Sequence, residues 1–216
     1  MYKKYLPDKI QRLAWVNTYI GLNYQETGDF LNAEKTLEDC LSIYREYLPK
    51  DHIDLAWVMT YLGDFYRKNK NYKKAKELLE ESLNIYQQQL SPPDHIWIAW
   101  AQLHLGILQL EIGNNKKAQN LLEESLVAFE KYLPPTHIWI ADTMVSLGKV
   151  YIRNNEYEKA RKQLDRSIFI YKEHLPENHI YIKRALQIRD KMDNYMHEGL
   201  LISSLNILWC KAKKLI

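Results

Sequence analysis

One block of sequence occurs four times in this chain, at a nearly constant spacing. An alanine is followed seven positions later by a glycine, and the glycines lie 42, 43 and 42 residues apart (63 − 21, 106 − 63, 148 − 106). A fixed period of this length indicates stacked helical or mixed units, which lack a single globular core with a catalytic cleft. The period therefore favours a binding surface over an enzyme. The four frames are Ala14/Gly21, Ala56/Gly63, Ala99/Gly106 and Ala141/Gly148.

The composition is that of a folded chain with a small net charge. Hydrophobic residues make up 46% and charged residues 26% of the 216 positions, which is typical of globular proteins. The formal net charge is only +3. Nucleic-acid binding needs a concentrated basic face, so we expect no nucleic-acid partner.

The two cysteines and the apolar segments indicate where such a chain works. Cys40 occupies the position held by Ser82, Ser125 and Ser167 in the other copies, which predicts a small buried packing residue. Cys210 is far away in sequence, and no stretch is long and apolar enough for a signal peptide or membrane span. A reducing, cytoplasmic setting is the expectation.

The pattern of apolar residues in each period predicts two amphipathic helices. In residues 51–92, apolar residues first recur at helical spacing up to about Lys68, then again from Ala75 to Tyr86. A polar turn separates them, and prolines close the second helix. The start of the first helix is predicted at an N-cap residue with a side-chain oxygen. These predicted caps are Asp51, Asp94, Thr136 and Asn178.

Small residues mark where the two helices should cross. Gly63 in the first helix and Ala75 in the second have equivalents in all four copies. Their lack of bulk predicts that the helix axes approach to about 8–10 Å. An aromatic residue, such as Tyr66, then fills the neighbouring space, and only the third copy replaces it, with Gln109.

This pattern resembles the tetratricopeptide repeat. Gly63, Tyr66, Ala75 and Pro92 match the family motif in order. The usual period is 34 residues, and the longer version here, opening on a histidine four residues before the alanine, is similar to kinesin light chains and many bacterial regulatory proteins. An isoleucine follows each of these histidines where that group often has proline. The resemblance implies an all-α fold, a right-handed superhelical solenoid of antiparallel helix pairs, over roughly residues 1–182.

The domain organisation follows from the register of the repeats. Residues 1–8 match the end of a second helix whose partner is missing, and residues 9–195 hold four repeats plus the first helix of a fifth. Residues 198–216 form a separate amphipathic segment. We expect this segment to cap the last repeat, as solenoids require. The alternative is that residues 200–216 contact a membrane surface or a partner.

The repeating histidines invite a metal interpretation that geometry excludes. Successive repeats stack about 10 Å apart, whereas zinc ligands converge within about 2.1 Å of one ion. A role in the first turn of each helix is the better interpretation. The sequence holds no phosphate-binding loop and no nucleophile motif. We therefore expect no catalytic residue, no metal and no cofactor.

The tryptophans indicate a binding groove along the first helices of the repeats. Five of the six lie on one rim of it, and tryptophan dominates binding hot spots. The alternative is that the rings only pack between neighbouring helices. Charged and apolar residues complete the candidate groove. The basic pair Lys149 and Arg153 in the fourth copy suits a carboxylate; the alternative is that these two side chains are only solvated. The candidate residues are Trp15, Trp57, Thr60, Asp64, Arg67, Trp97, Trp100, Leu103, Ile107, Trp139, Lys149, Arg153 and Tyr181.

The sequence thus predicts an adaptor or scaffold that binds a protein or peptide segment in its concave groove. Kinesin light chains hold peptides with groove asparagines, but the matching positions here are Thr18, Thr60, Leu103 and Val145, so their peptide preference does not carry over. The alternatives are a structural or self-associating segment of a longer array, which would form homo-oligomers through its terminal repeats, and a regulatory module of a larger protein.

Overall fold

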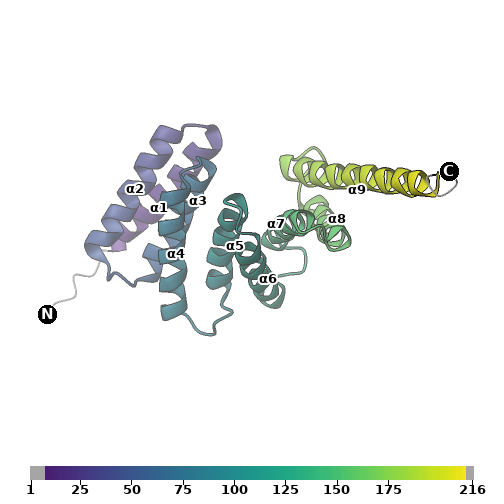
Figure 1. Ribbon diagram of the computed structural model, residues 1–216. Helices are drawn as coiled ribbons and strands as arrows, with labels where there is room; N and C mark the ends of the chain where they lie inside the picture. The colour runs from purple at the N-terminus through teal and green to yellow at the C-terminus, as the bar shows by residue number, and fades with distance from the viewer. Residues whose placement is uncertain (1–7, 213–216) are drawn as a thin grey trace. The chain divides into compact units, whose positions relative to one another are not determined.

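The computed structural model describes the backbone of residues 8–212 and the side chains of Arg12 and residues 14–196. Regular structure within those residues is entirely helical, which confirms the predicted all-α class (Figure 1). Successive helices form pairs of a helix A and a helix B. The pairs are α1 (Asp8–Thr27) with α2 (Phe30–Tyr47), α3 (Ile53–Lys68) with α4 (Tyr72–Gln89), α5 (Ile96–Glu111) with α6 (Asn115–Tyr132), and α7 (Ile138–Arg153) with α8 (Tyr157–His174), followed by α9 (Ile180–Ala212).

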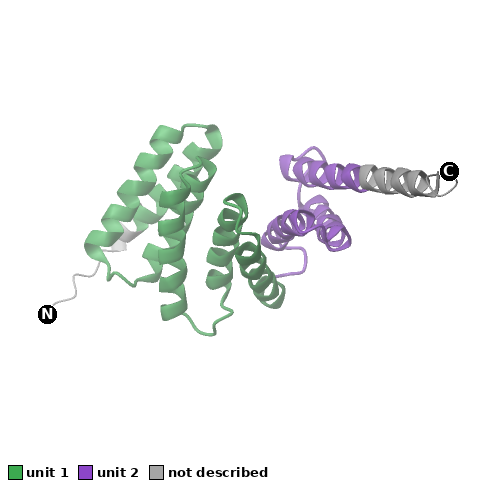
Figure 2. Cartoon of the chain, in the orientation of Figure 1, with its two compact units in different colours: residues 1–132 green, residues 133–216 purple. Residues whose placement is uncertain are grey.

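The chain divides into two compact units, which Figure 2 colours separately. Residues 1–132 hold the first three helix pairs, and residues 133–216 hold α7, α8 and α9. Inside each unit, a helix B packs against the helix A that follows it, as α2 does on α3, α4 on α5 and α8 on α9. Within the described residues, no helix is both long enough and apolar enough to cross a membrane.

The glycine frame marks the crossing of the paired helices, as predicted. A Cβ atom placed on Gly63 would lie 2.7 Å from Cγ of Leu79 in the partner helix, and the other three frame glycines meet the equivalent leucine at 2.8–2.9 Å. Ala75 and its equivalents are fully buried. The recurring small residues therefore set how closely each helix A approaches its helix B.

A second recurring contact lies beside this crossing. Ser82 Oγ donates to the carbonyl oxygen of Ala56 at 2.7 Å, and Ser125 makes the same bond to Ala99 at 2.8 Å. Cys40 is buried and its Sγ lies 3.4 Å from the carbonyl oxygen of Ala14. The predicted role of Cys40 as a small buried packing residue is confirmed, while the side chain of Cys210 lies outside the described residues.

The predicted position of the helix A caps is wrong by one residue. The capping side chain is the repeating histidine, whose Nδ1 accepts the backbone N–H two positions later. The distances are 3.2 Å at His52, 3.2 Å at His95, 3.1 Å at His137 and 3.3 Å at His179. An unprotonated imidazole nitrogen is an acceptor like the oxygens of the usual capping residues. The repeating histidines therefore have a helix-start role, which was the predicted interpretation.

The residues predicted as caps make other contacts. Asp51 accepts a hydrogen bond from Nε2 of Gln89 at 2.7 Å, and Asp94 accepts one from the hydroxyl of Tyr132 at 3.0 Å. Gln89 and Tyr132 are the last residues of their helices B. Asp51 and Asp94 thus tie the loop before a helix A to the end of its partner helix.

The turns between helices A and B fall where the sequence predicted them. Gly28, Lys70, Gly113 and Asn155 occupy the same repeat position, and all four have a positive φ, between 61° and 89°. The left-handed backbone is inexpensive for glycine and tolerated by asparagine. Lys70 is the residue least suited to it.

The ends of the array differ from the predicted boundaries or lie outside the described residues. Helix α9 runs without a break from Ile180 to Ala212, so its backbone does not separate residues 198–212 from the fifth helix A. Side chains beyond residue 196 are not described, and the choice between a cap and a membrane or partner contact stays a prediction. The predicted end of a helix B covers residues 1–8, of which 1–7 lie outside the described part and Asp8 begins α1.

Candidate functional site

The three helices A of the first unit each carry two ring-bearing residues four positions apart. Four residues make about one helical turn, so both rings of a pair lie on one face. We call this set the aromatic row. It consists of Trp15 and Tyr19 on α1, Trp57 and Tyr61 on α3, and Trp100 and His104 on α5.

Ring contacts join the aromatic row across the three helices. Trp15 stacks on Trp57 with centroids 6.4 Å apart, and Tyr61 meets Trp100 edge-on at 4.8 Å. Within each helix the two rings also touch, at 4.9–5.1 Å. Such pairs contribute beyond the area they bury. The row is therefore a continuous ring surface rather than a set of isolated side chains.

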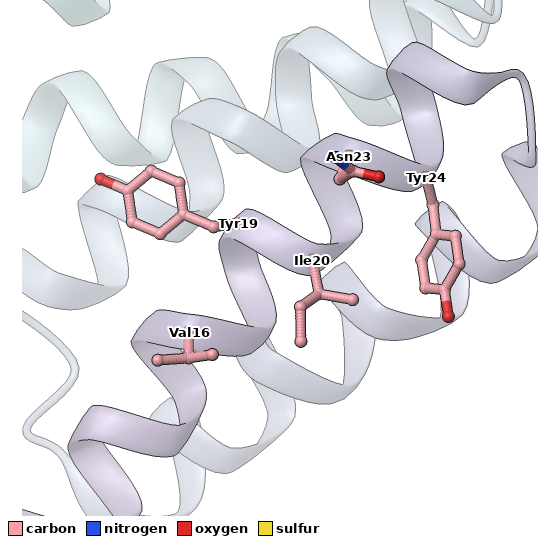
Figure 3. A pocket seen from close by; sticks show the side chains of 5 residues that line it. All are labelled: Val16, Tyr19, Ile20, Asn23 and Tyr24. Atoms are coloured by element: carbon pink, nitrogen blue, oxygen red, sulfur yellow. The ribbon is translucent and has the colours of Figure 1, made fainter.

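Exposure falls from the α1 end of the row to the α5 end. The side chain of Trp15 is 52% exposed and that of Tyr19, which lines the pocket drawn in Figure 3, is 46% exposed, while Trp57 and Tyr61 are half-buried and Trp100 is only 3% exposed. Burial, with smaller contributions from Tyr19 and Asp64, raises the pKa of Tyr61 to about 12. The α1 end of the row is accessible to a partner, whereas the α5 end is packing.

A cluster of charges begins one turn beyond Tyr61 on α3 and includes His104 of the row itself. The buried carboxylate of Asp64 is 2.8 Å from Nη2 of Arg67, 2.9 Å from Nζ of Lys68 and 3.2 Å from Nδ1 of His104. The Arg67 guanidinium also pairs with Glu111 on α5. This charge cluster ties α3 to α5.

The charge balance of the cluster fixes the state of Asp64. Burial alone would raise the pKa of Asp64, but the neighbouring His104, Arg67 and Lys68 outweigh it and hold the pKa well below its usual value. Arg67 is largely enclosed, while about half of the Lys68 side chain is accessible. Lys68 is thus the cation of this cluster best placed to meet a ligand.

A comparison with protein-family models identifies the repeat that carries the aromatic row. A family model for the tetratricopeptide repeat matches residues 12–88, 60–131 and 97–173, in overlapping stretches. The chain belongs to the tetratricopeptide repeat family. A comparison with curated protein sequences finds no match.

Solved structures share the tetratricopeptide fold of this chain at low sequence identity. A Podosopora anserina protein assigned as a kinesin light chain with nearly identical TPR-like repeats has 21% identity and a TM-score of 0.67, with 89% of this chain and 90% of that chain covered. BtubC (BKLC) from P. vanneervenii has 20% identity and a TM-score of 0.64, covering 80% and 67%. The expected likeness to kinesin light chains is confirmed.

A Rap protein solved in complex with Competence and Sporulation Factor is similar as well. Its identity is 15% and its TM-score 0.71, and the match covers 92% of this chain but only 54% of the Rap chain. This chain therefore spans about half the length of that protein. At these identities the likeness shows the fold alone.

The tetratricopeptide array places several predicted groove residues under the surface. Thr60 is fully buried, and its hydroxyl bonds to the carbonyl oxygen of Ala56 and to Ser82 on helix B. Leu103 and Trp100 are each only 3% exposed. These side chains support the surface from beneath, while Ile107 is half-buried.

The remaining predicted residues divide between the two units. Trp97 is half-buried against Trp100, with ring centroids 5.9 Å apart. Trp139, Lys149, Arg153 and Tyr181 lie on α7 and α9 of the second unit. There Tyr181 packs against His179 and Tyr171. These four residues form no part of the aromatic row.

The fourth tetratricopeptide repeat does not carry the row. Asp142 stands at the position of Trp57 and Trp100, and it accepts a hydrogen bond from the hydroxyl of Tyr171 on α8. Ser146 stands at the position of Tyr61 and bonds to the carbonyl oxygen of Asp142. The row is thus a feature of three helices, all in the first unit.

Half of the row was not predicted from the sequence. Tyr19, Tyr61 and His104 were not among the predicted groove residues, yet they complete the ring contacts. The available signal was a second ring-bearing residue four positions after each tryptophan, in three consecutive copies. Helical spacing alone places that residue beside the tryptophan.

Proposed function

We propose that this chain is a non-catalytic adaptor or scaffold whose aromatic row binds a segment of a partner protein. The observation that carries the proposal is the accessible end of the row, where Trp15 and Tyr19 are about half exposed and rest on Trp57. Folding does not require two large rings to be exposed to solvent at this end of α1. Tryptophan and tyrosine supply large contact area with few rotatable bonds.

The chemistry of the surface indicates what kind of segment it suits. The rings would accept an apolar or aromatic anchor, and Lys68, about two helical turns beyond Tyr61 on α3, would accept a carboxylate. We therefore propose a peptide in which a hydrophobic anchor and an acidic residue lie about 10 Å apart, the rise of seven helical residues. The similar Rap structure was solved with a bound factor, which supports a ligand-binding role for such arrays. A cytoplasmic setting stays our expectation, with Cys40 as a small buried packing residue.

A peptide screen with matched variants tests the proposal. The full chain is immobilised and probed with a random peptide library, and the affinities of the selected peptides are measured by fluorescence anisotropy. Trp15→Ala and Trp57→Ala should each weaken binding at least about tenfold, the effect of losing about 1.4 kcal/mol at a hot spot. Lys68→Ala should weaken acidic peptides more than neutral ones.

The control for this screen is Phe169→Ala. Phe169 lies on α8 and is 60% exposed, so the variant removes a comparable aromatic side chain outside the row. Circular dichroism establishes that each variant stays helical. Peptides that bind Trp15→Ala and Trp57→Ala as tightly as the unmodified chain would exclude the aromatic row as the site.

A further inference from the structure

The histidine caps of the helices A differ from ordinary helix caps in one chemical property. Each accepts a first-turn N–H through Nδ1, at 3.1–3.3 Å. This nitrogen accepts a hydrogen bond only while it carries no proton. Histidine changes its charge between about pH 5 and 8, whereas the oxygens of the usual capping residues stay acceptors over that range. Protonation would therefore turn each capping acceptor into a donor that faces another donor.

The electrostatics of a helix start act in the same direction. The aligned peptide dipoles place about half a positive charge at the N-terminus of a helix. An imidazolium in that position is repelled, whereas a carboxylate there is attracted. The response of each helix start to acid therefore depends on which charges lie beside its histidine.

At the start of α3, a carboxylate offsets the charge of a protonated cap. Asp54 lies in the first turn, and its Oδ2 is 3.7 Å from Nδ1 of His52. Tyr44 on α2 and Tyr86 on α4 also interact electrostatically with Asp54, but burial raises the pKa of both hydroxyls, so they stay uncharged. Asp54 is thus placed to pair with protonated His52. The residues that match Asp54 in the later copies are Trp97, Trp139 and Tyr181.

The start of α7 has the opposite surroundings. Trp139 stands in place of the carboxylate, and its ring meets the His137 ring edge-on at 5.1 Å. Burial, and secondarily the charge of His174 in the last turn of α8, lower the pKa of His137. Asp142, further along α7, accepts a hydrogen bond from the hydroxyl of Tyr171 on α8. The surroundings of His137 therefore oppose its protonation.

We propose that protonation of His137 releases the first turn of α7, so that mild acid loosens the start of the fourth repeat before the start of the second. The contact that is lost is the bond from the N–H of Trp139 to Nδ1. Because the folded chain lowers the pKa of His137, the stabilising contribution of this cap is present above the unfolded pKa of about 6.5 and is lost as the pH falls through the folded value. This response does not depend on whether the aromatic row binds a peptide.

Hydrogen exchange of two first-turn amides in the full chain tests the proposal. NMR follows the amides of Trp139 and Asp54 at about pH 7.5 and about pH 5, with each rate corrected for the intrinsic effect of pH on exchange. Protection at Trp139 should fall at least about fivefold, the effect of losing one cap. Protection at Asp54 should change less than about twofold, because the carboxylate compensates. Equal losses at both amides, or no loss at Trp139, would overturn the proposal.

Two matched substitutions identify the responsible groups. His137→Asn keeps a capping acceptor that gains no proton in this range, so protection at Trp139 should stay within about twofold at both pH values. Asp54→Asn is the reciprocal change, since it removes the carboxylate beside His52. The amide of residue 54 should then lose about fivefold in acid, as Trp139 does in the unmodified chain. A loss at Trp139 that persists in His137→Asn would show that another group causes it, and an unchanged amide in Asp54→Asn would refute the compensation.

Titration of the histidine rings by NMR covers the case of amides that exchange too fast to follow. The pKa of His137 should lie below its usual value of about 6.5. His174→Asn should raise it, because a neighbouring positive charge is removed. The His174 side chain is exposed, so this substitution should leave the packing of α8 intact. A His137 pKa at or above the usual value would show that the folded chain does not favour the unprotonated cap and would overturn the proposal.

Discussion

The substitution Gly63→Ala tests the close approach of α3 and α4 that defines each repeat. The new Cβ would lie 2.7 Å from Cγ and 2.9 Å from Cδ2 of Leu79, which is fully buried. Overpacking costs about 1–3 kcal/mol, and alanine regains about 1 kcal/mol of helix propensity. Because Cγ is a branch point and cannot swing away, the upper cost applies. We expect a net loss of about 2 kcal/mol in the free energy of unfolding (about 3 − 1).

Urea denaturation followed by far-UV circular dichroism measures this loss. The matched control is Leu79→Ala, which costs about 2–5 kcal/mol by itself but clears the space that the new Cβ needs. In the double variant, the substitution at Gly63 should no longer destabilise, so the two changes should be less than additive by about 2–3 kcal/mol. If Gly63→Ala alone raises stability by about 1 kcal/mol, the helices do not cross as closely as described and the reasoning is refuted.

Three further substitutions test other local arguments. The pKa of Asp64 is depressed in the folded chain. Its stabilising contribution is therefore present above the unfolded pKa of about 3.9 and is lost as the pH falls through the folded value. Asp64→Asn should reduce this loss of unfolding free energy at low pH, as measured by urea titrations at a series of pH values. His95→Ala removes the cap on the N–H of Trp97 and should lower the free energy of unfolding by about 1 kcal/mol. Lys70→Gly relieves a φ of 61° and should raise it by about 0.5–1 kcal/mol, and a decrease would contradict the left-handed turn.

The fold could be predicted because the period records a steric requirement. Gly63 and Ala75 recur in every copy since the helix pair cannot close around a larger side chain, and the contact of Gly63 with Leu79 is the direct consequence. The helix caps could not be placed as well. Asp51 and His52 are adjacent, both can accept a hydrogen bond, and only the path of the backbone decides which side chain reaches the first-turn N–H.

The candidate site was predictable in its residue types but not in its exposure. Trp15 and Trp100 occupy the same repeat position, yet their exposed fractions are 52% and 3%. The difference comes from neighbours that the sequence does not place. Trp100 is enclosed by Tyr61, His104 and Trp97, whereas the ring partners of Trp15 among the described side chains are Tyr19 and Trp57. Position in the stack, rather than residue type, therefore separates a contact residue from a core residue.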